Sequence, residues 1–132
     1  MSLASDLRRF AQKSNQKMET VIKSSLIRVG SSIVVKSPVD TGRFKNNWLS
    51  AYGTINTTVT QAVDPSGSAA IGRLTEKAAG VKVGETFYFT NSLPYAERLE
   101  YEGWSEQAKA GMVRVSVASW ESIVADEVAK AR

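Results

Sequence analysis

The feature that most constrains this chain is a long helical run at its N-terminus that stops at a proline. Apolar residues recur there at steps of mostly three and four, which is the period of an α-helix. They are Leu7, Phe10, Met18, Val21, Ile22, Leu26, Val29 and Ile33. Pro38 forces Ser37 out of helical geometry, so the helix is predicted to end near Lys36. A helix of about 30 residues spans roughly 45 Å, more than a small body needs, so residues 1–36 are expected to extend partly from it and pack on something else.

Two later segments have the pattern of β-strands. Residues 47–52 carry Trp48 and Tyr52 in a stretch that Gly53 closes, and residues 85–91 alternate aromatic with polar side chains. Both patterns predict strands of a small antiparallel sheet. The polar residues 54–60 between them favour extended backbone but offer little surface to bury, so an edge strand and a mobile loop both remain open.

Three further helices are expected. A turn over residues 64–67 leads into a short middle helix over residues 68–79, which Gly80 can close. Pro94 suits the first turn of a short helix that carries Tyr95 and Leu99 inward and that ends at Gly103.

The C-terminal residues 111–130 contain one helical stripe, although residues 112–117 alone alternate like a strand. Its members are Val113, Val117, Trp120, Val124, Val128 and Ala131. We predict a single helix there, and the strand interpretation of residues 112–117 stays open. The whole pattern predicts an α+β fold in one domain, residues 1–132, which is long enough to bury a core.

Composition shortens the list of chemistries. The chain has neither cysteine nor histidine, which removes disulfides, sulfur-ligated zinc and the usual Ser-His-Asp or Cys-His nucleophiles. We predict no enzyme, no cofactor and no metal. No apolar run reaches the roughly 18 residues that a membrane span needs, and the N-terminus has no signal-peptide core, so the protein is expected in the cytoplasm.

Charge is distributed unevenly. Residues 1–45 hold nine Lys or Arg against three acids, whereas residues 92–111 hold two against four. Segregated charge of both signs suits subunits that dock onto one another, and a basic surface also suits nucleic acid. A basic DNA-binding accessory protein is therefore an alternative function.

Asp40-Thr41-Gly42 matches the sequence in which aspartic proteases place their catalytic carboxylate, with Ala70-Ile71-Gly72 as a supporting element. Arg43 and Pro38 oppose this interpretation, because a cation would keep an aspartate pair ionised and the expected strand is missing. The simpler hypothesis is that Asp40 or Thr41 caps a turn, Gly42 supplies a special conformation and Arg43 is a surface or interface cation. An aspartic-type hydrolase is the less favoured alternative.

The stretch after residue 96 offers further interface candidates. Glu97, Glu100, Glu102 and Glu106 form an acidic cluster, which more often is a solvated face than a magnesium site. Trp104 follows in a polar stretch, where an exposed aromatic beside charges favours an interface and burial over the protein's own core is the alternative.

Taken together, the motifs resemble those of the tail-completion, or neck, proteins of long-tailed bacteriophages, also described as minor tail components. The resemblance rests on the long N-terminal helix followed by SPVDTGRFKNNW (residues 37–48), YFTNSLPYA (88–96), RLEY (98–101) and AGMVRV (110–115). It covers nearly the whole chain except residues 54–64.

This resemblance implies a structural virion subunit of a phage or prophage that forms a ring, commonly six-fold, where the tail meets the DNA-filled head. The implied partners are further copies of the chain, tail-tube or tail-terminator proteins and head-connector proteins, with incidental contact to DNA in transit. The implied location is the virion neck, and the host cytoplasm during assembly. The candidate interface or structural residues are Asp40, Thr41, Gly42, Arg43, Asn91, Pro94, Tyr95, Arg98, Glu100, Tyr101 and Trp104.

Overall fold

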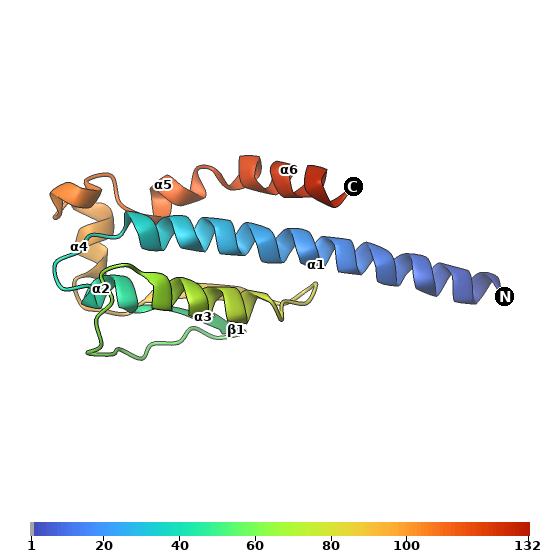
Figure 1. Ribbon diagram of the computed structural model, residues 1–132, viewed down its shortest axis with the longest axis horizontal. Helices are drawn as coiled ribbons and strands as arrows, with labels where there is room; N and C mark the ends of the chain where they lie inside the picture. Colours follow the sequence, from blue (N-terminus) through green and yellow to red (C-terminus); the bar gives the residue numbers. More distant parts are fainter. Residues whose placement is uncertain (1) are drawn as a thin grey trace.

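The computed structural model describes residues 2–132, and its longest element is helix α1 (Leu3–Lys36) (Figure 1). The Ser2 hydroxyl caps the start by accepting a hydrogen bond from the Ser5 N–H at 3.1 Å. At the other end Ser37 is extended, with φ −69° and ψ 137°, as a residue before proline must be. The predicted helix and its end near Lys36 are confirmed.

The two halves of α1 have different surroundings. Its C-terminal half lies between helix α3 (Ser68–Ala78) on one side and helices α5 (Val113–Val117) and α6 (Trp120–Ala131) on the other (Figure 1). Its N-terminal half continues past the end of α6, away from the rest of the molecule. Leu3, Leu7 and Phe10 on that half are 75%, 58% and 72% exposed.

Strands β1 (Trp48–Tyr52) and β2 (Phe87–Asn91) form a two-stranded antiparallel sheet. The register pairs Trp48 with Asn91 and Tyr52 with Phe87. Trp48 stacks on Phe89 with ring centroids 5.1 Å apart, a contact that stabilises the pair beyond the area it buries. The α+β class with a small antiparallel sheet, a middle helix and C-terminal helical structure is therefore confirmed.

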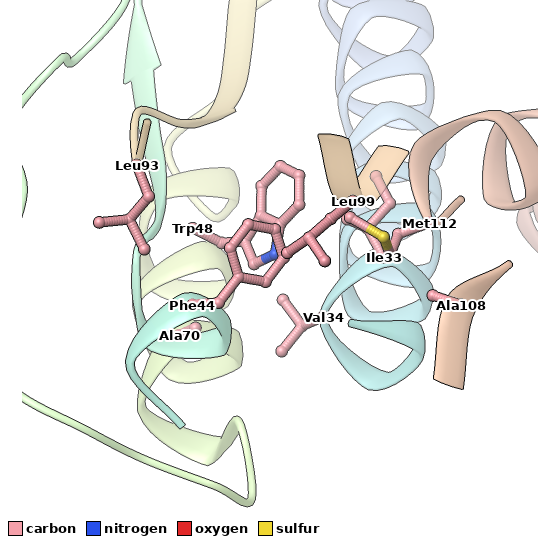
Figure 2. Packing of buried hydrophobic residues seen from close by; sticks show 9 residues of the cluster. All are labelled: Ile33, Val34, Phe44, Trp48, Ala70, Leu93, Leu99, Ala108 and Met112. Carbon is pink, nitrogen blue, oxygen red and sulfur yellow. The ribbon is translucent and has the colours of Figure 1, made fainter. Parts of the chain in front are cut away.

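The core lies where the C-terminal end of α1 meets the short elements. Helix α2 (Arg43–Asn46), helix α4 (Ala96–Tyr101) and the 3₁₀ turn η1 (Glu106–Ala108) close around it. Figure 2 shows the nine buried apolar residues of this cluster, which come from most of these elements. They are Ile33, Val34, Phe44, Trp48, Ala70, Leu93, Leu99, Ala108 and Met112.

The C-terminal segment differs from the prediction of one helix over residues 111–130. It is divided into α5 and α6 by a turn at Ala118–Ser119, and the strand alternative for residues 112–117 is wrong. Both helices contact α1. The start of α5 is held by α4, and its Ser116 hydroxyl lies 2.9 Å from that of Ser32, whereas α6 packs along α1.

One smaller prediction also changes, and the alternative left open for residues 54–60 is decided as a loop. Helix α4 begins at Ala96, so Pro94 and Tyr95 precede it, although Leu99 is buried as expected. Residues 55–64 run as a loop. Within residues 2–132, no helix is both long and apolar enough to cross a bilayer.

Candidate functional site

The turn after α1 is built to hold one shape. The buried Ser37 hydroxyl donates to the Ile33 carbonyl at 2.7 Å and accepts from the Trp48 indole N–H at 2.9 Å, which ties the helix end to β1. Gly42 has φ +93°, and a Cβ there would lie 2.4 Å from the backbone nitrogen of Pro65. Only glycine fits both the conformation and the space.

The neighbours of Gly42 have separate roles. The Thr41 hydroxyl accepts from the Arg43 N–H at 3.2 Å, so Thr41 performs the capping that was expected of Asp40 or Thr41. The Arg43 side chain is half-buried and its Nε donates to the Thr60 carbonyl at 3.2 Å. Arg43 thus fastens the loop of residues 55–64, and its role as a surface or interface cation stays a prediction. Asp40 is exposed.

The proposed support of an aspartic site lies elsewhere in the fold. Ala70-Ile71-Gly72 belongs to α3, where Ala70 is part of the core, and not to a strand-borne loop.

Three residues that fasten this region were not singled out from the sequence. Asn47 is fully buried; its amide donates to the Arg43 and Thr60 carbonyls at 2.7 and 3.1 Å, and its oxygen accepts from the Thr60 N–H at 2.9 Å. Arg73 donates to the Asn46 carbonyl at 2.7 Å. The sequence signal was weak, because Thr60 lies 13 residues from Asn47 and Asn46 lies 27 residues from Arg73.

Asp64 is the third of these residues and begins α3. Its carboxylate accepts from the Ser66 hydroxyl at 2.6 Å and from the Ala69 N–H at 2.8 Å. The hydrogen bond from Ser66, then that from Ala69, hold the pKa of Asp64 below its usual value. An Asp two residues before a serine in a Pro-Ser-Gly turn is the pattern that indicates this role.

Glu100 is the clearest correction to the candidate list. It was grouped with a solvated acidic face, but the residue is only 6% exposed. Its Oε1 accepts from the N–H groups of Met112 and Val113 at 2.9 and 2.8 Å. Its Oε2 accepts from the N–H and the Nε of Arg114, both at 3.0 Å. Glu100 therefore caps α5 from α4, and its burial removes it from the solvated acidic face.

The electrostatics of Glu100 follow from this geometry. Burial acts to raise its pKa, but the hydrogen bonds from the Val113, Arg114 and Met112 N–H groups and from the Arg114 guanidinium together outweigh burial and lower the pKa. The carboxylate is thus ionised at neutral pH. Arg114 also lies over the exposed ring of Tyr101, with its guanidinium carbon 4.8 Å from the ring centroid.

Asn91 and Pro94 are also placed by the fold. The Asn91 amide donates to the Phe44 carbonyl at 2.8 Å, and its oxygen accepts from the Leu93 N–H at 3.2 Å. Asn91 therefore locks the end of β2 to α2. Pro94 is exposed and lines a shallow depression with Arg98 and Tyr101.

The remaining candidates meet in one surface hollow of 470 Å³, which we call the Trp104 hollow. Its walls are residues 38–44 and, from 50 residues later, Tyr95, Leu99, Trp104, Ser105 and Gln107. The structure thus brings Asp40, Thr41, Gly42 and Arg43 together with Tyr95 and Trp104. Sequence reasoning did not identify Gln107, whose amide exchanges two hydrogen bonds with the backbone of Val39, at 2.9 and 3.0 Å.

The aromatic side of the hollow is partly open. Trp104 is 59% exposed, so burial over the protein's own core, the alternative weighed for it, is not what the fold shows. Its ring lies 6.3 Å from Tyr95, and the Arg98 guanidinium carbon lies 5.5 Å above it. Tyr95 in turn contacts the core through Phe44, at 5.9 Å between centroids. An apolar floor with one exposed indole is the composition of an interface centre.

A second apolar groove, of 340 Å³, lies between α1 and the end of α6. Met18, Val21 and Ile22 face Val128 and Ala131 across it. This groove follows the apolar stripe of α1 toward its exposed half.

No protein-family model matches the chain, and neither a curated protein nor a solved structure is significantly similar to it.

Proposed function

We propose that this chain is a structural subunit of a long-tailed phage or prophage, a tail-completion or neck protein that forms a ring where the tail joins the head. The observation that carries the proposal is the exposed half of α1, whose apolar residues Leu3, Leu7 and Phe10 have no cover in residues 2–132. Such a face on an otherwise packed chain favours a partner. The sequence resemblance to neck proteins supports further copies of the chain and phage tail or head proteins as the partners.

The hollow supports the same proposal. Three of the motifs that carry the resemblance, residues 37–48, 88–96 and 98–101, contribute to it although the first is far from the other two in the sequence. Its rigid frame, built by Gly42 and Gln107, suits docking of protein surfaces. In this proposal the partners are further copies of the chain and tail-tube, tail-terminator or head-connector proteins.

The decisive experiment is deletion of the coding sequence in a phage or prophage that carries it. Loss of a neck protein should give DNA-filled heads and finished tails that do not join, visible by electron microscopy, with infectivity restored by the wild-type chain supplied in trans. Normal numbers of joined virions after deletion would contradict the proposal. Binding of the purified protein to isolated tails, imaged by negative stain, gives a second readout.

DNA binding is a second candidate, favoured by the exposed cations Arg8, Lys13 and Lys17 on the free half of α1. Contact with phosphates depends steeply on salt. If DNA binding were the main function, purified protein should retard duplex DNA at physiological salt, and Lys13→Glu with Lys17→Glu should abolish it. Retardation of DNA that disappears at physiological salt would show only incidental contact and would contradict DNA binding as the main function.

A further inference from the structure

Two of the exposed apolar features lie toward opposite ends of the described residues, because α4 and the N-terminal end of α1 are at opposite ends in Figure 1. One is the α1 tip, residues 3–17, which extends past α6 except at Lys17, which lines the groove beside the end of α6. The other is the Trp104 hollow, which lies at the C-terminal end of α1, since Gln107 binds Val39 three residues after the helix ends. At about 1.5 Å per residue, the tip projects roughly 22 Å.

The α1 tip combines an apolar side with a basic flank. Leu3, Leu7 and Phe10 are spaced i, i+4, i+7 and therefore share one side of the helix. Lys13 and Lys17 follow Phe10 at i+3 and i+7, so they lie beside the same stripe. All five residues are exposed.

The hollow has the complementary chemistry. Tyr95, Leu99 and Trp104 give it an apolar floor. Asp40 on its wall is an exposed carboxylate, and the exposed Glu97 lies outside the hollow, in the neighbouring depression that Arg98 and Tyr101 also line. Neither acid is in an ion pair within residues 2–132. Arg43 also lines the hollow and Arg98 lies over Trp104, so cations are present there as well; the Arg43 Nε is hydrogen-bonded to the Thr60 carbonyl and the Arg98 guanidinium lies over the indole.

Resting on the proposed function, we propose that the α1 tip of one copy docks in the Trp104 hollow of the next copy. The apolar side of the tip covers Trp104 and Tyr95, and Lys13 and Lys17 face Asp40 and Glu97. Because the two surfaces differ and lie at opposite ends, the contact is heterologous, and repetition gives a ring if the rotation closes.

The competing arrangement is a symmetric pair of antiparallel α1 tips. With Ser14 at the two-fold axis, Phe10 would meet Met18 and Leu7 would meet Val21 of the other copy. The same symmetry brings Lys13 and Lys17 of both copies to one side of the seam, within about a turn of each other. Like charges so placed oppose association, whereas the hollow offers acids.

Disulfide trapping tests the proposal, because the chain has no cysteine of its own. Ala11→Cys, one turn from Leu7, keeps the apolar side of the tip intact, and Asp40→Cys lies on the wall of the hollow. The two variants, one carrying a mass tag, are mixed and mildly oxidised. We expect the mixed disulfide to exceed either homodimer at least about fivefold, and adding Trp104→Ala to the Asp40→Cys chain to lower it about tenfold, a loss of about 1.4 kcal/mol.

The matched control replaces Asp40→Cys with Val83→Cys, which is exposed on the loop before β2 and away from the hollow; it should give no mixed disulfide above background. Predominance of the Ala11→Cys homodimer would establish the symmetric pair and overturn the proposal. Oligomers in light scattering without the mixed disulfide would overturn the docking but leave the ring function standing. A monomer without cross-links also overturns the docking, and the deletion phenotype then decides the function separately.

Discussion

At the scale of single residues, the fold depends on a few side chains and turns that hold distant segments together. Gly42, Ser37 and Asn47 fix the reversal after α1, and Glu100 fixes the start of α5. Each contacts another segment of the chain. Substitutions at these positions are expected to lower the free energy of unfolding and to affect binding surfaces only as a consequence.

Gly42→Ala should destabilise the protein more than Gly53→Ala. Both glycines have positive φ, +93° and +77°, which costs an alanine about 1–2 kcal/mol. At Gly53 an added Cβ meets nothing within 4 Å, whereas at Gly42 it meets the backbone of Pro65 at 2.4 Å. Urea unfolding of both variants gives the comparison, and equal losses would show that the turn around Gly42 relaxes freely.

Glu100→Gln should lower the free energy of unfolding by about 2 kcal/mol or more, because four hydrogen bonds to a buried carboxylate are weakened or broken. Glu97→Gln on the exposed side of the same helix is the control and should change it by less than about 0.5 kcal/mol. Similar losses in both variants would contradict the assignment of Glu100 as an internal cap.

The pH dependence gives an independent check on the same carboxylate. The pKa of Glu100 is lower in the folded than in the unfolded chain, so its contribution is complete above the unfolded value of about 4.3. That contribution is lost as pH falls through the folded pKa. The stability difference between wild type and Glu100→Gln should therefore be constant above about pH 5 and shrink below pH 4. A stability difference that grows as the pH falls would mean that folding raises the pKa of Glu100 and does not lower it.

At the scale of elements, the helical period predicted α1 and its end correctly because Pro38 and the apolar stripe are local signals. The C-terminal helix was predicted as one piece because its stripe continues in period across Ala118 and Ser119. The structure divides it at those two residues, and the start of α5 is fixed by Glu100, a long-range contact that lies outside that window. The same cause explains why Glu100 was assigned to the surface: an acid in a polar stretch usually is solvated, and its partners at residues 112–114 are invisible locally.

The candidate site was predictable in part for the same reason. The turn of residues 37–43 and the aromatic stretch after Pro94 were singled out as separate motifs, but only the fold joins them across Gln107. Asn47 was missed because a buried asparagine satisfied by a distant loop looks like any polar residue.

The two halves of α1 should differ in hydrogen exchange. A helix without tertiary packing is marginal in water, so amides of residues 6–16 should exchange within seconds in the monomer while those of residues 25–34 are protected. On assembly, protection should spread into residues 6–16, as read by mass spectrometry of peptic fragments. Strong protection of the tip in a dilute monomer would mean that it already packs on the chain itself.

At the scale of the whole molecule, substitutions can reverse the sign of the charge at each end. Lys13→Glu with Lys17→Glu makes the tip acidic, and Asp40→Lys with Glu97→Lys makes the hollow basic. Each double variant alone places like charges together and should assemble at least about 100-fold less tightly, a difference of about 2.7 kcal/mol.

Mixing the two double variants restores opposite charges at every contact, so oligomers should reappear in light scattering. Their subunits should alternate, and added salt should weaken them. Failure of the mixture to assemble, with both variants folded, would contradict the charge pairing.

The unbroken course of α1 from the body to its tip sets the phase of the apolar side as well as its reach. Each residue turns an α-helix by about 100°. Deleting Asn15 alone would therefore rotate Leu3, Leu7 and Phe10 by that angle while leaving every one of them present, and Asn15→Ala would rotate nothing. If the tip docks on a neighbouring copy, the deletion should abolish assembly in light scattering and the substitution should not. The number of residues in this helix therefore sets the direction in which its apolar side faces the neighbour.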